Sequence, residues 1–305
     1  MNIIKIIKCF IPHGIILLRG RYIRRKQDKL VFEIHKKEKE IKKYFLNLNE
    51  DEQDSEVLEI INFLRKNSFS VFPYDFIKKY HAEEIGVFYD EIFQLKYVLY
   101  NNKRLYFPKH FSYEKIRGYY NSILIEQDAD SPHRYDAENF IVQDGDIIAD
   151  IGVAEGIWAL TYAEKAKKIY LFECEEYWIE ALQKTFEPWK EKVILVNKYV
   201  SDVTDEKKIT LDNFLCGDKI DFIKTDIEGA EIQFLRGAKK ILTDNNVKLL
   251  LCTYHQQNDA VDIKDFLLES GFITEYSKGY MLFIFDKNIR PPYLRRGLIR
   301  ARKKL

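Results

Sequence analysis

The pattern of apolar and polar positions becomes regular from about residue 140. Short apolar runs then alternate with amphipathic stretches, which predicts strands alternating with helices. Two last runs, 272–276 and 280–285, are expected to close the sheet as an antiparallel hairpin. This alternation predicts a doubly wound α/β sheet with right-handed crossovers. The expected strands cover 147–151, 168–172, 193–200, 220–224 and 247–253, and the expected helices cover 157–166, 176–186, 230–242 and 259–270.

The residues before 140 follow a less regular pattern. A charged stretch followed by an apolar stripe predicts helical structure over 33–66. Residues 97–100 and 104–107 favour strands, and Asn101-Asn102 between them suits a tight turn. Ser112 is expected to cap a helix that runs to about Ile125. We therefore divide the chain into a basic segment 1–30, an extension 31–139, a domain 140–286 and a basic tail 287–305.

Charge is concentrated at the two ends. Residues 1–30 carry eight Lys and Arg against one Asp, and residues 287–305 carry eight and no acid, although the whole chain is at +1. The remaining body is therefore acidic, which makes nucleic acid a poor partner. Both ends also mix aliphatic with basic residues, so we expect peripheral contact with an anionic membrane. The alternative is that both basic ends pack against the acidic body.

Other features of the whole sequence bear on the cellular location of the protein. No run of about 20 apolar residues is present, and the N-terminus lacks the pattern of a signal peptide. The cysteines are far apart in the sequence, which suits a reducing compartment rather than a disulfide framework. We expect a cytoplasmic protein, with the inner membrane face as a possible location. The four cysteines are Cys9, Cys174, Cys216 and Cys252.

The segment Asp150-Ile-Gly152-Val-Ala-Glu155-Gly156 is the richest candidate for a ligand site. It lies between the first strand and the first helix of the regular region, at the edge where open α/β sheets bind ligands. Glycines let the backbone approach a ligand closely, and a carboxylate suits a cationic ligand such as S-adenosylmethionine (SAM). The spacing D-x-G-x-x-x-G disfavours a pyrophosphate cradle. An ordinary turn is the alternative.

Acidic residues and one histidine follow the other strands. Glu173 ends the second strand, where an acid typically binds the ribose hydroxyls of an adenine nucleoside; a solvated acid is the alternative. Asp226 and Glu228 follow the fourth strand and are expected to face the same pocket. His255 ends the fifth strand and is a candidate general base, although a lone histidine is often only structural. These three residues could also bind a divalent ion, but no spacing enforces one, so we expect no metal.

Several segments together resemble the FkbM-type SAM-dependent methyltransferases. They are DIGVAEG, LFECEE, ITLDNF and IDFIKTDIEGAEIQFLRGA, with the strand that ends at His255. The resemblance covers about 140–275, roughly 45% of the chain, and KTDIEGAE is its most specific element. The chain departs from the family at Val153-Ala154, at Cys174 and at Thr253. These departures leave the cofactor assignment standing and weaken that of the base.

The resemblance implies a class I (Rossmann-like) methyltransferase sheet with an antiparallel closing pair and SAM as the cofactor. By position, the cofactor-binding residues would be Asp150, Gly152, Glu155, Gly156 and Glu173, and those facing the transferred methyl would be Asp226, Glu228 and His255. The family acts mostly on sugar or polyketide hydroxyls. We expect O-methylation of a glycan or sugar precursor, with the extension 31–139 building the acceptor site.

Three alternatives remain open at this point. The acceptor could be a polyketide or lipid hydroxyl, or the chain could be a SAM-binding scaffold or a membrane-surface adaptor without turnover. Residues 126–136, which precede the first strand of the domain, could cover the pocket and bring His133, Arg134 and Tyr135 to the substrate, or they could be a plain linker. The oligomeric state is not indicated by any pattern.

Overall fold

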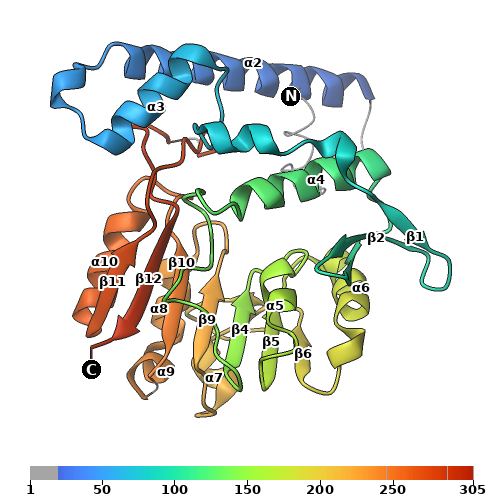
Figure 1. Ribbon diagram of the computed structural model, residues 1–305. Helices are drawn as coiled ribbons and strands as arrows, with labels where there is room; N and C mark the ends of the chain where they lie inside the picture. The colour runs from blue at the N-terminus through green and yellow to red at the C-terminus, as the bar shows by residue number, and fades with distance from the viewer. Residues whose placement is uncertain (1–19, 245, 287, 305) are drawn as a thin grey trace.

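The computed structural model describes residues 20–244, 246–286 and 288–304, with side chains from residue 32 onward. Its centre is a seven-stranded sheet in the order β11-β12-β10-β9-β4-β5-β6 (Figure 1). The five strands from β10 to β6 are parallel, and β12 is antiparallel to both of its neighbours. This arrangement is the class I methyltransferase fold that the sequence predicts. The strands are β4 (Ile147–Ile151), β5 (Lys168–Phe172), β6 (Val193–Val196), β9 (Phe222–Thr225), β10 (Lys248–Cys252), β11 (Phe272–Tyr276) and β12 (Leu298–Lys303).

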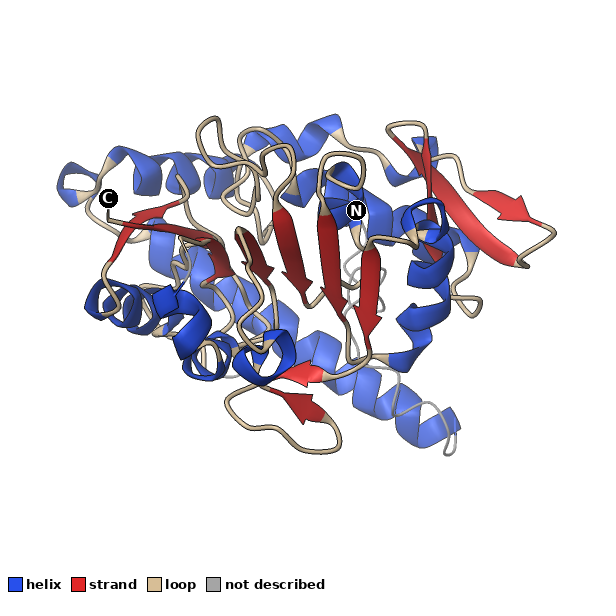
Figure 2. Ribbon diagram, turned by 90° about the horizontal axis from the view of Figure 1, so that it is seen from below, coloured by secondary structure: helices blue, strands red, loops and turns tan. Residues whose placement is uncertain are grey.

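Both faces of this sheet are buried, and helices cover each of them (Figure 2). Successive side chains of a strand point to opposite faces. Ile148 and Leu250 therefore join the core formed with the N-terminal region, whereas Ala149 and Leu251 join the core on the opposite face. The first core includes α5 (Ile157–Thr161) and α6 (Glu176–Thr185), and the second includes α7 (Leu211–Leu215), α8 (Glu231–Gly237), α9 (Lys239–Asp244) and α10 (Asp259–Glu269).

The closing strand of the sheet differs from the expected one. β11 pairs with β12, Phe272 lying opposite Lys303, so the hairpin expected from 280–285 is wrong. Within 280–285 only Met281 forms a bridge, to Arg295. The sheet therefore continues beyond the domain boundary expected at residue 286 and includes part of the basic tail. Aliphatic and basic residues alternate in this part of the tail, so the sequence pattern did not predict a strand there. In the structure the Arg300 and Lys303 side chains of this strand have partners inside the protein.

Two of the expected elements are each divided into two in the structure. Residues 193–200 form β6 and then β7 (Tyr199–Val200), which pairs in parallel with β8 (Lys208–Ile209) in a separate small sheet. The helix expected over 230–242 breaks after Gly237 into α8 and α9. A Cβ at residue 237 would lie only 2.0 Å from the carbonyl oxygen of Ser201, so the close approach of these two backbones requires glycine.

The N-terminal region lies over the carboxyl edge of the sheet (Figure 1). The expected hairpin and capped helix are confirmed: Asn101 and Asn102 adopt φ angles of 48° and 62° in the turn, and Ser112 accepts a hydrogen bond from the Lys115 amide at 3.1 Å. α4 brings its side chains to the edge where β4 and β9 end. The elements are α2 (Gly20–Leu46), η2 (Glu50–Glu52), α3 (Ser55–Lys66), η3 (Asp75–Lys79), η4 (Ala82–Glu84), β1 (Phe88–Asp90), β2 (Leu95–Tyr100), β3 (Lys103–Phe107) and α4 (Tyr113–Glu126), with η5 (Glu187–Trp189) after α6.

Candidate active site

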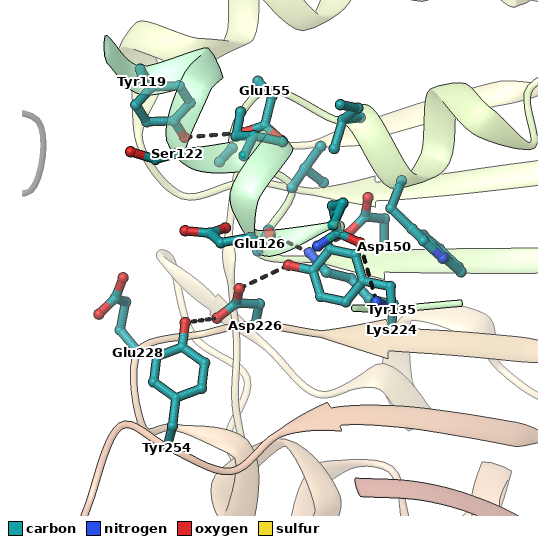
Figure 3. A pocket seen from close by; sticks show the side chains of 17 residues that line it. Tyr119, Ser122, Glu126, Tyr135, Asp150, Glu155, Lys224, Asp226, Glu228 and Tyr254 are labelled. Atoms are coloured by element: carbon teal, nitrogen blue, oxygen red, sulfur yellow. Dashed lines mark hydrogen bonds and ion pairs between the residues drawn. The ribbon is translucent and has the colours of Figure 1, made fainter. Parts of the chain in front are cut away.

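A cavity lies at the carboxyl edge of the sheet, between the loops after β4 and β9 and helix α4 (Figure 3). Five of the predicted site residues line it, whereas Gly156, Glu173 and His255 lie outside its lining. The five are Asp150, Gly152, Glu155, Asp226 and Glu228. The fold thus brings together residues that are as much as 78 positions apart in the sequence.

The loop after β4 is held close to the loop after β9. Gly152 has a φ of +75°, and a Cβ there would lie 1.9 Å from the carbonyl oxygen of Asp226. Gly156 also has a positive φ, +84°. An alanine at residue 152 would have to push the two loops apart, so glycine is required by the fold as well as by any ligand.

Asp150 forms a buried ion pair with Lys224 of the neighbouring strand β9, at 2.9 Å. The Lys224 ammonium also donates to the carbonyl oxygen of Gly152 at 2.9 Å. Burial raises the pKa of Asp150, and the lysine opposes that rise only in part. Burial lowers the pKa of Lys224, but the carboxylates of Asp150 and Asp226 outweigh this and raise it. The carboxylate expected to meet a cationic ligand is therefore already paired with a cation of the protein.

Glu173 follows β5 and holds the loop after β4 in place. Its carboxylate accepts hydrogen bonds from the backbone amides of Ala154, at 2.8 Å, and Glu175, at 2.7 Å. The side chain is buried, and burial raises its pKa. Two of the four lone-pair positions of a carboxylate are used by these amides, which leaves acceptor capacity for hydroxyl groups of a ligand.

Helix α4 contributes residues that the sequence did not single out. The Tyr119 hydroxyl donates to Glu155 at 2.9 Å, and Ser122 and Glu126 line the cavity on the same side (Figure 3). Burial raises the pKa of Glu155 to about 7. Residues 119 and 122 share one helical face with Glu126, which begins the segment 126–136 considered in the sequence analysis. For Tyr119 and Ser122 this spacing was the only signal in the sequence that could have identified them.

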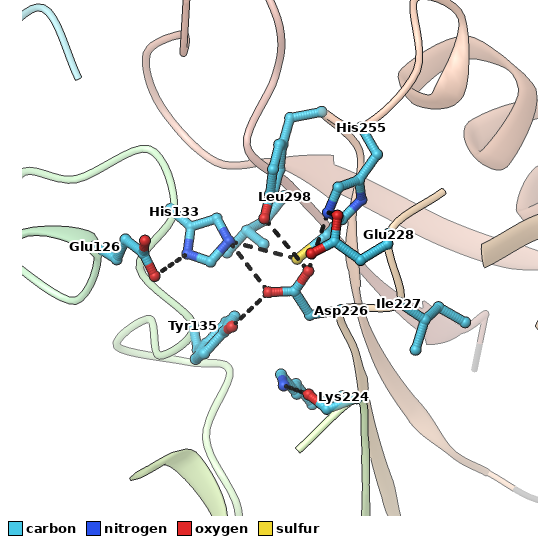
Figure 4. A network of polar contacts seen from close by, with 12 residues as sticks. Glu126, His133, Tyr135, Lys224, Asp226, Ile227, Glu228, His255 and Leu298 are labelled. Atoms are coloured by element: carbon cyan, nitrogen blue, oxygen red, sulfur yellow. Dashed lines mark hydrogen bonds and ion pairs between the residues drawn. The ribbon is translucent and has the colours of Figure 1, made fainter. Parts of the chain in front are cut away.

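Asp226 is the centre of a polar network at the end of β9 (Figure 4). Its carboxylate accepts hydrogen bonds from Tyr135 at 3.0 Å and from Tyr254 at 3.3 Å. Its oxygens also lie 3.3 Å from His255 Nε2 and 3.6 Å from His133 Nε2. Burial alone would raise the pKa of Asp226, but the contact with His255 and the nearby cations hold it well below the ordinary value. Asp226 is therefore ionised.

The two histidines of this network differ in their protonation. Burial lowers the pKa of His133 to about 4, so its ring is neutral. Burial also disfavours the charged ring of His255, but its contacts with Asp226 and Glu231 outweigh burial and raise its pKa well above the ordinary value. His255 does not line the cavity itself, whereas Asp226 and Glu228, which it contacts, do. The role of His255 as general base therefore stays a prediction.

Residues 126–136 are more than a linker. Glu126, Gln127 and Tyr135 line the cavity, and His133 contacts Asp226, whereas Arg134 is not part of the lining. Arg300 of β12 donates to the carbonyl oxygen of Arg134 at 2.6 Å and so ties this segment to the sheet. Of the two alternatives left open by the sequence, the structure favours a segment that borders the pocket.

Several basic residues of the C-terminal tail have partners inside the protein. Arg295 is 1% exposed in its side chain and pairs with Asp286 at 2.6 Å, and Arg296 pairs with Glu56 of α3 at 2.7 Å. Leu298 and its neighbour in β12 are fully buried. Leu298 and Ile299 of this end therefore belong to the core, and the expected contact of this end with a membrane stays a prediction. Residues 1–19 of the other basic end lie outside the described residues.

Among the helices that the structure describes, none combines the length and the apolar character that crossing a bilayer requires.

The strand order and the cavity at its carboxyl edge define a class I methyltransferase fold. Residues 187–274 match the model of the methyltransferase FkbM domain, which confirms the resemblance indicated by the sequence motifs. This match includes Asp226, Glu228 and His255. It begins after the loop that follows β4 and after Glu173, so neither of these is part of it. No curated protein matches the chain by sequence.

Similar solved structures include several methyltransferases. The FkbM methyltransferase of Methylobacillus flagellatus KT has a TM-score of 0.44 and 15% identity, over 62% of this chain and 54% of that one. Precorrin-6y C5,15-methyltransferase of Geobacter metallireducens GS-15 scores 0.37 at 15% identity, over 53% and 83%. An rRNA methylase of Streptococcus thermophilus scores 0.38 at 18% identity, over 54% and 90%. The match thus spans about half of the FkbM structure, and the assignment of the fold rests on the strand order.

Proposed function

We propose that this protein is a SAM-dependent methyltransferase that transfers the methyl group to a hydroxyl of a glycan or sugar precursor. One observation carries this proposal. The glycine-containing loop after β4, with Glu173 beside it, borders the same cavity as the carboxylates of Asp226 and Glu228. A nucleoside cofactor and an acceptor would therefore meet at one edge of the sheet, where open α/β folds bind their ligands.

The cofactor would lie along the loop after β4. Gly152 and Gly156 give this loop its shape, and Glu173 retains acceptor positions for the ribose hydroxyls. Glu155 and the Asp150–Lys224 pair line the cavity and would lie beside the amino acid part of SAM. Because Lys224 is paired with Asp150, the pair carries little net charge. The buried lysine would therefore not repel the sulfonium of the cofactor.

The reaction would be an in-line displacement. The hydroxyl oxygen of the acceptor forms a bond to the methyl carbon as the bond from that carbon to sulfur breaks, which releases S-adenosylhomocysteine (SAH). The hydroxyl proton leaves to a base. Asp226 and Glu228 are the expected catalytic residues that border the cavity, whereas His255 lies behind them. Positioning of the two reactants would supply much of the acceleration.

The walls of the cavity favour a hydroxyl-rich acceptor. Tyr119, Tyr135 and Tyr254 combine ring surfaces with hydroxyl groups, and Ser122 and Gln127 add further polar groups. Rings can pack against the carbon face of a sugar while polar groups meet its hydroxyls. A polyketide or lipid hydroxyl is the competing acceptor. Tritiated SAM supplied with nucleotide sugars, isolated glycans and lipid extracts separates the two, because the label should enter only the sugar-containing fractions.

Calorimetry on the full-length protein tests the cofactor assignment. We expect SAM and SAH to bind at micromolar strength, and Glu173→Ala to weaken binding at least tenfold because the ribose contact and the loop are both lost. Glu176→Ala, which removes an exposed carboxylate three residues away, is the matched control and should leave affinity unchanged. Circular dichroism would verify that both variants are folded. Absence of heat with either ligand, or equal affinity in Glu173→Ala, would contradict the proposal.

A further inference from the structure

His255 occupies an unusual position behind the cavity. Its side chain is 4% exposed, and within the described part of the chain neither ring nitrogen makes a hydrogen bond of good geometry. Carboxylates nevertheless surround it. Nε2 lies 3.3 Å from Asp226 Oδ1 and 3.9 Å from Glu228 Oε2 (Figure 4). Nδ1 lies 3.3 Å from Glu231 Oε1.

The fold places these four side chains together. β9 and β10 are adjacent parallel strands, with Thr225 opposite Leu251, so the residues that follow them emerge at the same edge. Glu228 adopts a φ of 57°, which L-residues with side chains rarely do. In this conformation its carboxylate turns back toward His255. Gly229 follows with a φ of +92° and lets the chain enter α8.

We propose that His255 Nε2, Asp226 Oδ1 and Glu228 Oε2 bind one divalent transition-metal ion. Ligand atoms about 2.1 Å from an ion are about 3.0 Å apart in octahedral and about 3.4 Å apart in tetrahedral geometry. The 3.3 Å separation of Asp226 and His255 fits this range directly. The Glu228 side chain is 87% exposed and can close the remaining gap by rotation.

Glu231 completes the arrangement as an outer-sphere partner. Metal-binding histidines commonly donate their second ring N–H to a carboxylate, which fixes the ring and its tautomer. Glu231 is 1% exposed, faces Nδ1, and is itself held by the backbone amide of Ile227 at 3.1 Å. It can therefore orient the ring so that Nε2 faces Asp226 and Glu228.

The charges around the ring also favour an ion. Three carboxylates meet one imidazole, and the nearby Lys224 is already paired with Asp150. The Asp226 and Glu231 side chains are only 19% and 1% exposed, and buried charges need compensation, which a divalent cation would supply at this point. One nitrogen with two carboxylate oxygens suits manganese, iron, cobalt or zinc better than calcium or magnesium, which prefer oxygen ligands alone.

An ion held here would border the cavity through Asp226 and Glu228. An acceptor hydroxyl bound to it would lose its proton more readily, since a metal ion lowers the pKa of a bound oxygen. This catalytic consequence rests on the proposed function, whereas the binding of the ion does not.

Manganese binding to the full-length protein tests the site. Protein treated with EDTA and then dialysed is titrated with MnCl₂, and free Mn²⁺ is followed by electron paramagnetic resonance. We expect one ion per chain, and at least tenfold weaker binding in Glu228→Gln, in His255→Ala and, through the outer sphere, in Glu231→Gln. The exposed residues His81 and Glu206 provide matched controls, and His81→Ala and Glu206→Gln should bind as the unmodified chain does.

Because Glu228 is exposed, its variant should fold even if His255→Ala does not. The proposal is overturned if the chain binds no ion at millimolar MnCl₂, or if Glu228→Gln binds it unchanged. Loss of the ion in His133→Ala with retention in Glu228→Gln would place it instead beside Cys252, whose sulfur lies 3.5 Å from His133. Calorimetry with SAH in EDTA, on the same preparation, shows separately whether the proposed methyltransferase function fails.

Discussion

Glu155 offers a test of the electrostatics of the cavity that needs no substrate. The side chain is 8% exposed, and burial raises its pKa from 4.5 to about 7. The Tyr119 hydroxyl and the Lys224 ammonium favour the charged form, and Asp150 disfavours it, but burial is the largest effect. The folded protein therefore prefers the protonated carboxyl, whereas the unfolded chain ionises near the ordinary pKa.

The sign of the pH dependence follows from this preference. Below pH 4.5 the carboxyl is protonated in both states and has no effect on the free energy of unfolding. As pH rises from 4.5 to about 7, the unfolded chain releases the proton and the folded protein does not, so stability falls. Each pKa unit corresponds to about 1.4 kcal/mol, so the loss reaches about 3 kcal/mol at pH 8 and about 1 kcal/mol at pH 5.

Glu155→Gln removes this penalty and keeps an oxygen that accepts the Tyr119 hydrogen. We expect the variant to be more stable than the unmodified protein by about 3 kcal/mol at pH 8 and by about 1 kcal/mol at pH 5. Urea unfolding followed by circular dichroism at both pH values measures the difference. Glu206→Gln, at an exposed position, should show no gain at either pH. A gain that is equal at both pH values, or none at pH 8, would refute the reasoning.

Two further predictions concern the ends of the chain. Leu298→Ala, in the fully buried start of β12, should lower the free energy of unfolding by about 3 kcal/mol. Leu268→Ala, at a position that is 48% exposed, should lower it far less. If urea unfolding shows similarly small losses for both variants, the C-terminal strand is not integral to the core. We also propose that the basic segment 1–30 contacts anionic membranes. The full-length chain should float with phosphatidylserine-containing vesicles at low salt and release as salt rises, and replacing the segment's Lys and Arg by Ser should abolish flotation. A chain that ignores such vesicles at low ionic strength would rule this out.

Local patterns in the sequence determined most of the central sheet. Runs such as 147–151 and 248–252 are apolar on both of their faces except at Asp150 and Lys248, so both faces of the sheet could be expected to be buried. Turn residues act over a few positions, which is why the Asn101-Asn102 turn and the Ser112 cap were predictable. The acids after β4 and β9 were found because the end of a parallel strand fixes where the next side chains emerge.

Only the tertiary structure decided which groups those side chains meet. Asp150 was expected to face a ligand, but it pairs with Lys224, and His255 was expected to be a base, but it lies between Asp226 and Glu231. These contacts join strands and loops whose separation in the sequence carries no information about their distance in space. β12 shows the same limit. Arg295 and Arg296, just before this strand, and Arg300 within it suggest a solvated tail. They can be buried because Asp286, Glu56 and the backbone of residue 134 are their partners, and a charge is buried only where the rest of the fold supplies its counterpart.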